Sequence, residues 1–168
     1  DGRVGWLGYS WGRSFRRDTT TGERYPFAAD QPHTLQAVWS QPFHETSRWR
    51  WGARLLAHSG QPYTRVVGRT EETYTDADGN DQSYWAPVYG DLNGGRLPPF
   101  VRLDLRAERS YRFGWGELTT SFSLLNVTEP LRPNVTGYDY ADDYSNYDDP
   151  DKASGFPFLP SFSIRATL

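Results

Sequence analysis

A two-residue alternation of apolar and polar side chains is the clearest pattern along this chain. It is strongest between Phe100 and Phe113. One set of alternate positions there is apolar and the other is polar and mostly charged: Val101, Leu103, Leu105, Ala107 and Tyr111 against Arg102, Asp104, Arg106, Glu108, Ser110 and Arg112. Because successive side chains of a strand point to opposite faces, this segment predicts a β-strand with one apolar and one ionic face.

Five further segments repeat the alternation. They run over Leu7–Phe15, Leu35–Trp39, Trp49–His58, Leu118–Leu124 and Phe162–Leu168. No stretch shows the 3.6-residue apolar stripe of an amphipathic helix. The pattern therefore predicts an all-β chain with about six long antiparallel strands.

The connections between these segments alternate in length. Those at Pro42–Arg48 and Gly114–Gly116 are short, whereas Asp18–Pro32, Val66–Pro99 and Thr128–Pro157 are long. Short turns on one rim and long loops on the other are typical of outer-membrane barrels, in which the short rim is periplasmic. The fold class predicted is thus a partial antiparallel transmembrane β-barrel.

The longest connection is expected to carry an extracellular hairpin. Glu71–Thr75 and Gln82–Trp85 flank the turn-rich segment Asp76–Asp81. Its acidic residues superficially look like a calcium loop, but no Glu follows at the distance that a calcium-binding loop requires. A hairpin tip is the favoured interpretation.

Composition narrows the function classes. The 168 residues include no cysteine and no run of about 18 apolar residues, which excludes a thiolate site and a transmembrane helix. A net charge of -3 provides no basic surface for nucleic acid. The aromatic content of 16%, with 7 Trp and 11 Tyr, suits rings at two membrane interfaces, although carbohydrate-binding β-domains are also rich in aromatic residues.

Five phrases, in order along the chain, resemble the C-terminal barrel of TonB-dependent receptors: Tyr25–Leu35 (YPFAADQPHTL), Ser59–Thr64 (SGQPYT), Arg96–Arg109 (RLPPFVRLDLRAER), Leu124–Pro130 (LLNVTEP) and Gly155–Leu168 (GFPFLPSFSIRATL). Such barrels usually end in an aromatic residue, and Leu168 departs from that pattern. The resemblance covers essentially all of residues 1–168 and identifies them as a C-terminal barrel portion without the plug domain.

The resemblance implies a location and partners. Receptors of this family are 22-stranded barrels around a plug in the bacterial outer membrane, and they draw energy from a TonB-type periplasmic coupling protein. They bind and import scarce ligands such as siderophores, cobalamin or oligosaccharides. Six strands cannot close a barrel, so the remaining strands and the plug must come from the same polypeptide or from another chain. Outer-membrane lipid is the other expected partner.

Two sets of loop residues are candidates for binding. Aromatic residues of the long connections could stack on a ligand: Tyr74, Tyr84, Trp85, Tyr138, Tyr140, Tyr144 and Tyr147. Clustered carboxylates in the last connection could hold calcium, although nothing in the sequence requires a cofactor: Asp142, Asp143, Asp148 and Asp149. For both sets, the simpler alternative is a solvated surface loop.

Charged residues of the strands form a third set, expected to face the lumen: Arg50, Arg54, Arg102, Asp104, Arg106, Glu108 and Arg165. Their mixed signs fit a plugged barrel better than a selective open pore. The three histidines, His33, His44 and His58, show no metal-ligand spacing, and no catalytic arrangement of Ser, His and Asp is evident. We therefore expect no enzymatic activity.

Two alternatives to a transport receptor remain open. The chain could belong to an outer-membrane complex in which it has a structural role and transports nothing. It could also be a soluble, aromatic-rich carbohydrate-binding β-sandwich, in which the apolar strand faces pack against a second sheet.

Overall fold

The computed structural model describes residues 2–45 and 47–168, and all its regular secondary structure is β-strand. Over these residues, the structure contains no helix suited to crossing a membrane. One large sheet and four small two-stranded sheets make up the described part. The prediction of an all-β, antiparallel chain is confirmed.

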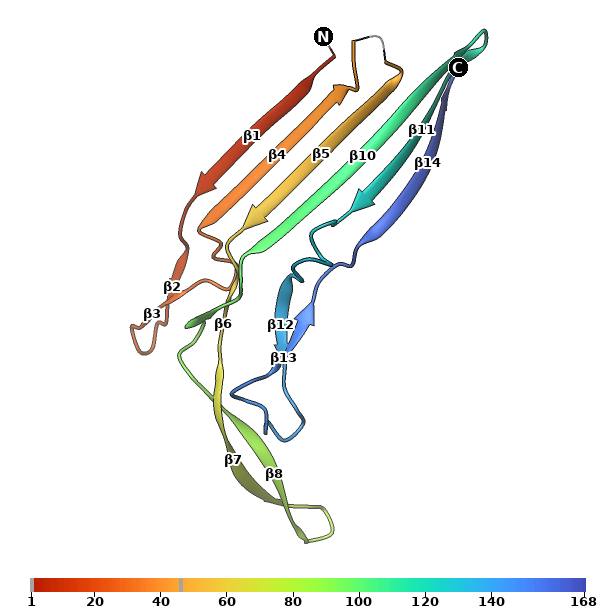
Figure 1. Ribbon diagram of the computed structural model, residues 1–168. Coiled ribbons are helices and arrows are strands. Elements are labelled where there is room, and N and C mark those ends of the chain that lie inside the picture. Colours follow the sequence, from red (N-terminus) through yellow and green to blue (C-terminus); the bar gives the residue numbers. More distant parts are fainter. Residues whose placement is uncertain (1, 46) are drawn as a thin grey trace.

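The large sheet contains the six strands predicted from the alternation. Its spatial order is β1 (Val4–Trp11), β4 (His33–Pro42), β5 (Trp49–His58), β10 (Phe100–Phe113), β11 (Gly116–Leu125) and β14 (Leu159–Thr167) (Figure 1). Every neighbouring pair is antiparallel. We call this the main sheet.

Several strand boundaries differ from the prediction by a few residues, and the first two strands differ most. β4 starts before Leu35 and continues to Pro42, because β1 pairs with it from His33 to Ser40 and β5 pairs with it from Thr34 to Pro42. The first strand ends at Trp11 instead of continuing to Phe15. Beyond Trp11, the amide of Ser14 donates to the Asp30 carboxylate at 2.6 Å instead of joining a ladder. Phe15 then starts a separate short strand.

The small sheets all lie beyond one end of the main sheet (Figure 1). They pair β2 (Phe15–Arg17) with β3 (Arg24–Pro26), β6 (Pro62–Tyr63) with β9 (Gly95–Arg96), β7 (Val66–Thr75) with β8 (Asp81–Tyr89), and β12 (Val135–Asp139) with β13 (Asp151–Ser154). The β7–β8 pair is the predicted hairpin, longer at its base than expected. The other three pairs were not predicted, because such short strands carry too little alternation to be recognised.

The hairpin tip is held by its own acidic residue. Asp76 Oδ1 accepts the amides of Asp78 and Asn80 at 3.0 and 2.9 Å, and Gly79 adopts a positive φ of 86°. Hydrogen bonding, chiefly from the Asn80 amide, lowers the pKa of the Asp76 carboxyl. This carboxylate therefore closes a turn, as the hairpin interpretation expects.

The register gives the main sheet one apolar face. Leu105 lies opposite Ala53 and Leu124, and the same face continues to both edges. Its members, strand by strand, are mostly apolar: Leu7, Tyr9 and Trp11; Leu35, Ala37 and Trp39; Trp49, Trp51, Ala53, Leu55 and Ala57; Val101, Leu103, Leu105, Ala107, Arg109, Tyr111 and Phe113; Leu118, Thr120, Phe122 and Leu124; Pro160, Phe162, Ile164 and Ala166.

This apolar face is not covered by another layer of the described chain. Leu7 is 72% exposed, Phe162 64% and Ile164 63%. The buried hydrophobic residues of the described part are Val66 and Leu97, both outside the main sheet. The sheet therefore exposes a continuous apolar surface that a folded soluble domain would bury.

The main sheet is open. Each of its edge strands, β1 and β14, is paired on one side within the described residues. No closed barrel is formed by this part of the chain. The other edge of each strand presents backbone N–H and C=O groups to any further strand that would complete a wall.

Candidate functional site

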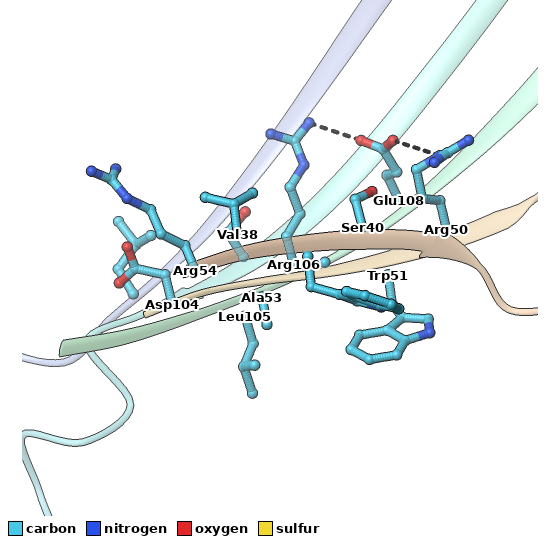
Figure 2. Close-up of a pocket in the computed structure, with 14 residues that line it drawn as sticks. Val38, Ser40, Arg50, Trp51, Ala53, Arg54, Asp104, Leu105, Arg106 and Glu108 are labelled. Carbon is cyan, nitrogen blue, oxygen red and sulfur yellow. Dashed lines mark ion pairs between the residues drawn. The ribbon is translucent and has the colours of Figure 1, made fainter. Parts of the chain in front are cut away.

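The seven charged residues expected in the lumen all lie on the second face of the main sheet, opposite the apolar face. Glu108 lies between two arginines: its carboxylate is 3.1 Å from Arg106 Nη2 and 3.8 Å from Arg50 Nε (Figure 2). Arg102 Nε donates to Asp104 at 2.8 Å. We call this surface the ionic face.

Figure 2 shows how sharply the two faces are separated. The side chains of Arg50, Arg106 and Glu108 extend from one side of the strands, whereas Trp51 and Leu105 extend from the other. A cavity of about 320 Å³ lies along these residues. Side chains only one position apart therefore meet different surroundings, which is the direct result of strand geometry.

The ionic face carries more cations than anions. Six arginines share it with three carboxylates: Arg50, Arg54, Arg102, Arg106, Arg112 and Arg165 against Asp104, Glu108 and Glu117. Within the described residues, Arg54 and Arg165 form no ion pair. The ionic face thus carries a surplus of positive charge.

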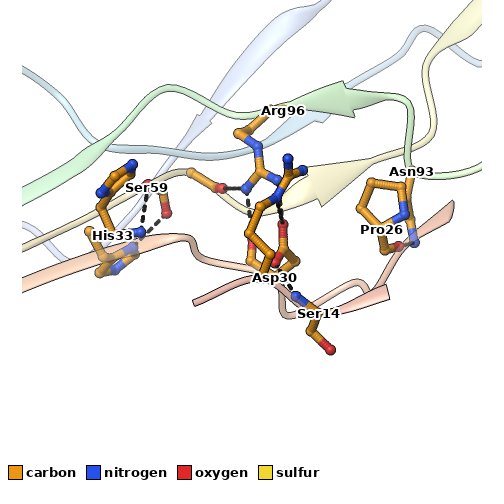
Figure 3. Close-up of polar contacts among 10 residues, drawn as sticks. Ser14, Pro26, Asp30, His33, Ser59, Asn93 and Arg96 are labelled. Atoms are coloured by element: carbon orange, nitrogen blue, oxygen red, sulfur yellow. Dashed lines mark hydrogen bonds and ion pairs between the residues drawn. The ribbon is translucent and has the colours of Figure 1, made fainter. Parts of the chain in front are cut away.

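An ion pair with the buried carboxylate of Asp30 joins several segments that lie beyond the end of the main sheet. Asp30 Oδ2 accepts from Arg96 Nη2 at 2.6 Å, and Arg96 Nη1 donates to the backbone oxygens of Asp30 and Gly60 at 2.6 and 2.7 Å (Figure 3). Together with the Ser14 amide, these contacts connect four separate segments. Burial opposes ionisation of Asp30, but the hydrogen bonds from Ser14 and Arg96 outweigh it and lower the pKa of this carboxyl.

A second buried polar cluster follows β11. The Asn134 side chain donates to Val101 O at 2.9 Å and accepts the Val101 amide at 2.9 Å, so it mimics a strand partner for β10. Glu129 accepts from the side chains of Asn126 and Asn134 at 3.2 and 3.0 Å. The cluster fixes the start of the last long connection, and it includes Asn126 and Glu129 from the LLNVTEP segment.

The long connections enclose a tyrosine-lined cavity of about 470 Å³. It lies between the base of β7 and the segment 138–152. Four tyrosines and four charged residues line it: Tyr63, Tyr138, Tyr140 and Tyr147, with Arg65, Asp148, Asp149 and Lys152. The rings of Tyr63 and Tyr138 are 5.1 Å apart. Burial raises the pKa of the Tyr63 phenol above its ordinary value.

An ion pair fastens the two walls of this cavity together. Arg69 of β7 donates through Nη1 to the Asp143 carboxylate at 2.7 Å and to the Asp143 backbone oxygen at 3.0 Å. The same guanidinium lies 4.3 Å from the centre of the Trp85 ring. Hydrogen bonds from Ser145, followed by the pairing with Arg69, lower the pKa of the Asp143 carboxyl below its ordinary value.

The structure divides the predicted aromatic residues into groups. Tyr138, Tyr140 and Tyr147 line the cavity, and Tyr144 contacts Tyr140 with ring centres 6.1 Å apart. Trp85 belongs to the Arg69 contact described above. Tyr74 and Tyr84 pair further out on the hairpin, with centres 6.0 Å apart. The Tyr84 hydroxyl donates to Glu72 at 2.6 Å, and this bond raises the Tyr84 pKa.

The four predicted calcium ligands are also divided. Asp148 and Asp149 line the tyrosine cavity, whereas Asp143 is engaged by Arg69 and Ser145. In the described part of the chain, no group of three His, Cys, Asp or Glu side chains could hold a metal ion. Calcium binding by Asp142 and its neighbours stays a prediction without support from this geometry.

His33 and His58 connect strands of the main sheet. His33 Nδ1 forms a hydrogen bond with the Tyr9 hydroxyl at 2.8 Å, and His58 stacks on Phe100 with ring centres 4.7 Å apart. Both contacts join neighbouring main-sheet strands at the end facing the loops.

Sequence reasoning missed half of the tyrosine cavity. Tyr63 and Arg65 lie about 75 residues before the segment that faces them, and no local pattern connects the two. Their only signal was the SGQPYT phrase, which contains Tyr63. Comparisons with protein-family models, with curated proteins and with solved structures gave no match.

Proposed function

We propose that this chain forms part of the wall of a transmembrane β-barrel in the bacterial outer membrane. The apolar face of the main sheet contacts lipid, and the ionic face lines the interior. The observation that carries the proposal is the exposure of a continuous apolar face across all six strands, with charged residues confined almost entirely to the other face. A lipid bilayer is the surrounding in which this arrangement is stable.

The distribution of aromatic residues supports a membrane position. Tyr9 and Trp11 lie at the end of β1 that faces the loops, and Trp49 and Tyr111 lie toward the short turns. Aromatic rings at the two ends of an apolar band are typical of the two membrane–water interfaces. The short turns are then periplasmic, and the tyrosine cavity is extracellular.

We further propose that the complete protein is a receptor that binds and imports a scarce ligand, similar to TonB-dependent receptors. The tyrosine cavity is the candidate ligand site on the extracellular side. The surplus of arginine on the ionic face supports an acidic partner inside the barrel, and a plug domain is the partner that the resemblance implies.

Insertion is tested by refolding the protein that contains this chain into phospholipid vesicles. Lys152 is the single lysine of the chain, and it lies in the segment proposed to be extracellular. A lysine-specific protease added outside should therefore cut this chain at Lys152, and a broad-specificity protease should cut the loops and leave intact the main sheet, which the bilayer protects. A protein that stays soluble and monomeric without detergent, and ignores vesicles, would support the β-sandwich alternative and refute the proposal.

Import is tested separately in cells that produce the protein. A ferric hydroxamate chelate, cobalamin and a linear maltooligosaccharide are suitable radiolabelled probes. Uptake of one probe that stops when the proton gradient is collapsed supports energy-coupled import. Correct membrane insertion without gradient-dependent uptake of any of the three would favour the structural-component alternative.

A further inference from the structure

One arginine lies on the apolar face of the main sheet. Arg109 of β10 pairs in register with Trp49 and Thr120, and its neighbours on the same face are Ala107 and Tyr111. It is the one residue of β10 that breaks the alternation of apolar and polar positions between Val101 and Tyr111. A charged residue at such a position needs a physical explanation, because the rest of this face excludes charge.

Two aromatic rings contact the Arg109 guanidinium, but no acceptor or carboxylate of the described part of the chain pairs with it. The Arg109 Cζ atom lies 5.4 Å from the Trp49 ring centre and 4.8 Å from the Tyr111 ring centre. Its Nε is buried and has no hydrogen-bond partner. Over the residues that the structure describes, this side chain forms no ion pair either. The rings orient the cation, and neither terminal Nη group of Arg109 has a hydrogen-bond or ion-pair partner among the described residues, so these two groups are the donors left for a ligand.

The position of Arg109 along the strand places it near one interface. Its register partner Trp49 is the first residue of β5, directly after the short β4–β5 connection. In a barrel, an outward-facing arginine costs about 2–4 kcal/mol at the bilayer midplane and roughly 0–1 kcal/mol near the interface. Arg109 thus lies where headgroups begin, at the rim with the short turns.

We propose that Arg109, oriented by Trp49 and Tyr111, binds the phosphate of an anionic phospholipid headgroup. This inference rests on the membrane orientation proposed above. A lipid is favoured over a protein partner because β10 is paired on both sides and its side of the sheet is the one exposed to acyl chains. The planar guanidinium matches the two oxygens of a phosphate, and the flanking rings pack against the glycerol and upper acyl region.

The test measures lipid retention by the complete protein after reconstitution into vesicles of equal phosphatidylglycerol and phosphatidylcholine. The protein is extracted in mild detergent, and bound lipid is counted by native mass spectrometry. We expect a bound phosphatidylglycerol in preference to phosphatidylcholine. Arg109→Leu and Arg109→Gln should each reduce that preference at least about tenfold, because both remove a charge-assisted pair.

Arg112→Leu is the matched control. Arg112 lies on the same strand near the same rim, but it belongs to the ionic face, where its side chain is 86% exposed and pairs with Glu117 at 3.3 Å. This variant should keep the wild-type preference. The Gln variant covers the case in which Arg109→Leu does not insert.

The outcomes separate the two proposals. If the protein inserts but both Arg109 variants retain phosphatidylglycerol as the wild type does, the lipid site is wrong and the membrane orientation stands. The lipid site is equally wrong if Arg112→Leu loses the preference to the same extent as the Arg109 variants. If the wild-type protein does not insert into vesicles, the proposed function and the lipid site fail together.

Discussion

An arginine introduced at Leu105 should destabilise the protein far more than one introduced on the ionic face. Leu105 is near the middle of the apolar face, in register with Ala53 and Leu124, and 38% of it is exposed. In the proposed orientation, that exposed part contacts acyl chains. The Leu105→Arg side chain would have no nearby water, so the bilayer would have to become thinner locally, or water would have to enter it, to solvate the charge.

The expected cost follows from depth. An outward-facing arginine at the bilayer midplane costs about 2–4 kcal/mol in a barrel. Since about 1.4 kcal/mol corresponds to a tenfold change in an equilibrium constant, the folding equilibrium should shift roughly 30- to 700-fold toward the unfolded state. The control variant is Gln36→Arg. Gln36 is exposed on the ionic face of β4, and its register partner on β1 is Gly8, which leaves room for a longer side chain. Its cost should stay below about 1 kcal/mol, as for most exposed substitutions.

Ser121 also lies on the ionic-face side, but it would be a poor control. It is 5% exposed, and its hydroxyl contacts Arg106 at 3.2 Å and Ser163 at 2.7 Å. Replacing it with arginine would add a steric cost that has nothing to do with lipid.

The measurement is a urea titration of both variants and the wild type of the complete protein in phospholipid vesicles, followed by tryptophan fluorescence. Equal destabilisation by Leu105→Arg and Gln36→Arg would refute the assigned sidedness. So would a larger cost for Gln36→Arg, because the face of Gln36 would then be the one in contact with lipid.

Three further predictions concern the loops. Hydrogen bonding holds the Asp30 pKa below its ordinary value of 3.8, so the pair with Arg96 should stabilise the loops above about pH 4 and lose this effect as the pH falls through the folded pKa. Protease digestion of the wild-type loops should therefore be slower at pH 7 than at pH 3, whereas the loops of Asp30→Asn should be cut readily at both. Gly60→Ala should disrupt the same junction, since an added Cβ would lie 1.8 Å from Leu97 O, whereas Gly12→Ala meets nothing within 4 Å and should leave the thermal unfolding midpoint unchanged. Arg69→Met should free one wall of the tyrosine cavity and speed lysine-specific cleavage at Lys152 severalfold at unchanged global stability; an unaltered cleavage rate would mean that the ion pair does not fasten that wall.

The two-faced strands were predictable because their signal is local. In β10, each side chain is assigned to a face by its position in a two-residue repeat, and this holds whatever the strand pairs with. The hairpin around Gly79 was predictable for the same reason, since its turn residues are adjacent in the chain. Arg109 was not singled out from the sequence, because one exception within a strong alternation carries little weight. Its environment depends on two rings, Trp49 of the neighbouring strand β5 and Tyr111 of β10 itself.

The loop architecture was not predictable in this way. Asp30 and Arg96 are 66 residues apart, and Arg69 and Asp143 are 74 apart. Neither pair belongs to a repeat, so nothing in the sequence indicates which opposite charges meet. The tyrosine cavity depends on such contacts, and accordingly the predicted aromatic set included three of its tyrosines and also residues that lie elsewhere, such as Tyr74.

The sequence by itself determined the six long strands, their two faces and which connections are short, because each of these follows from the chemistry of residues close together in the chain. The tertiary structure alone decided which distant segments share a cavity and which charges pair. Those contacts depend on the register of the main sheet. This register places the end of β5, the start of β10 and the end of β11 at one rim, where the attached loops lie close enough to pack against each other.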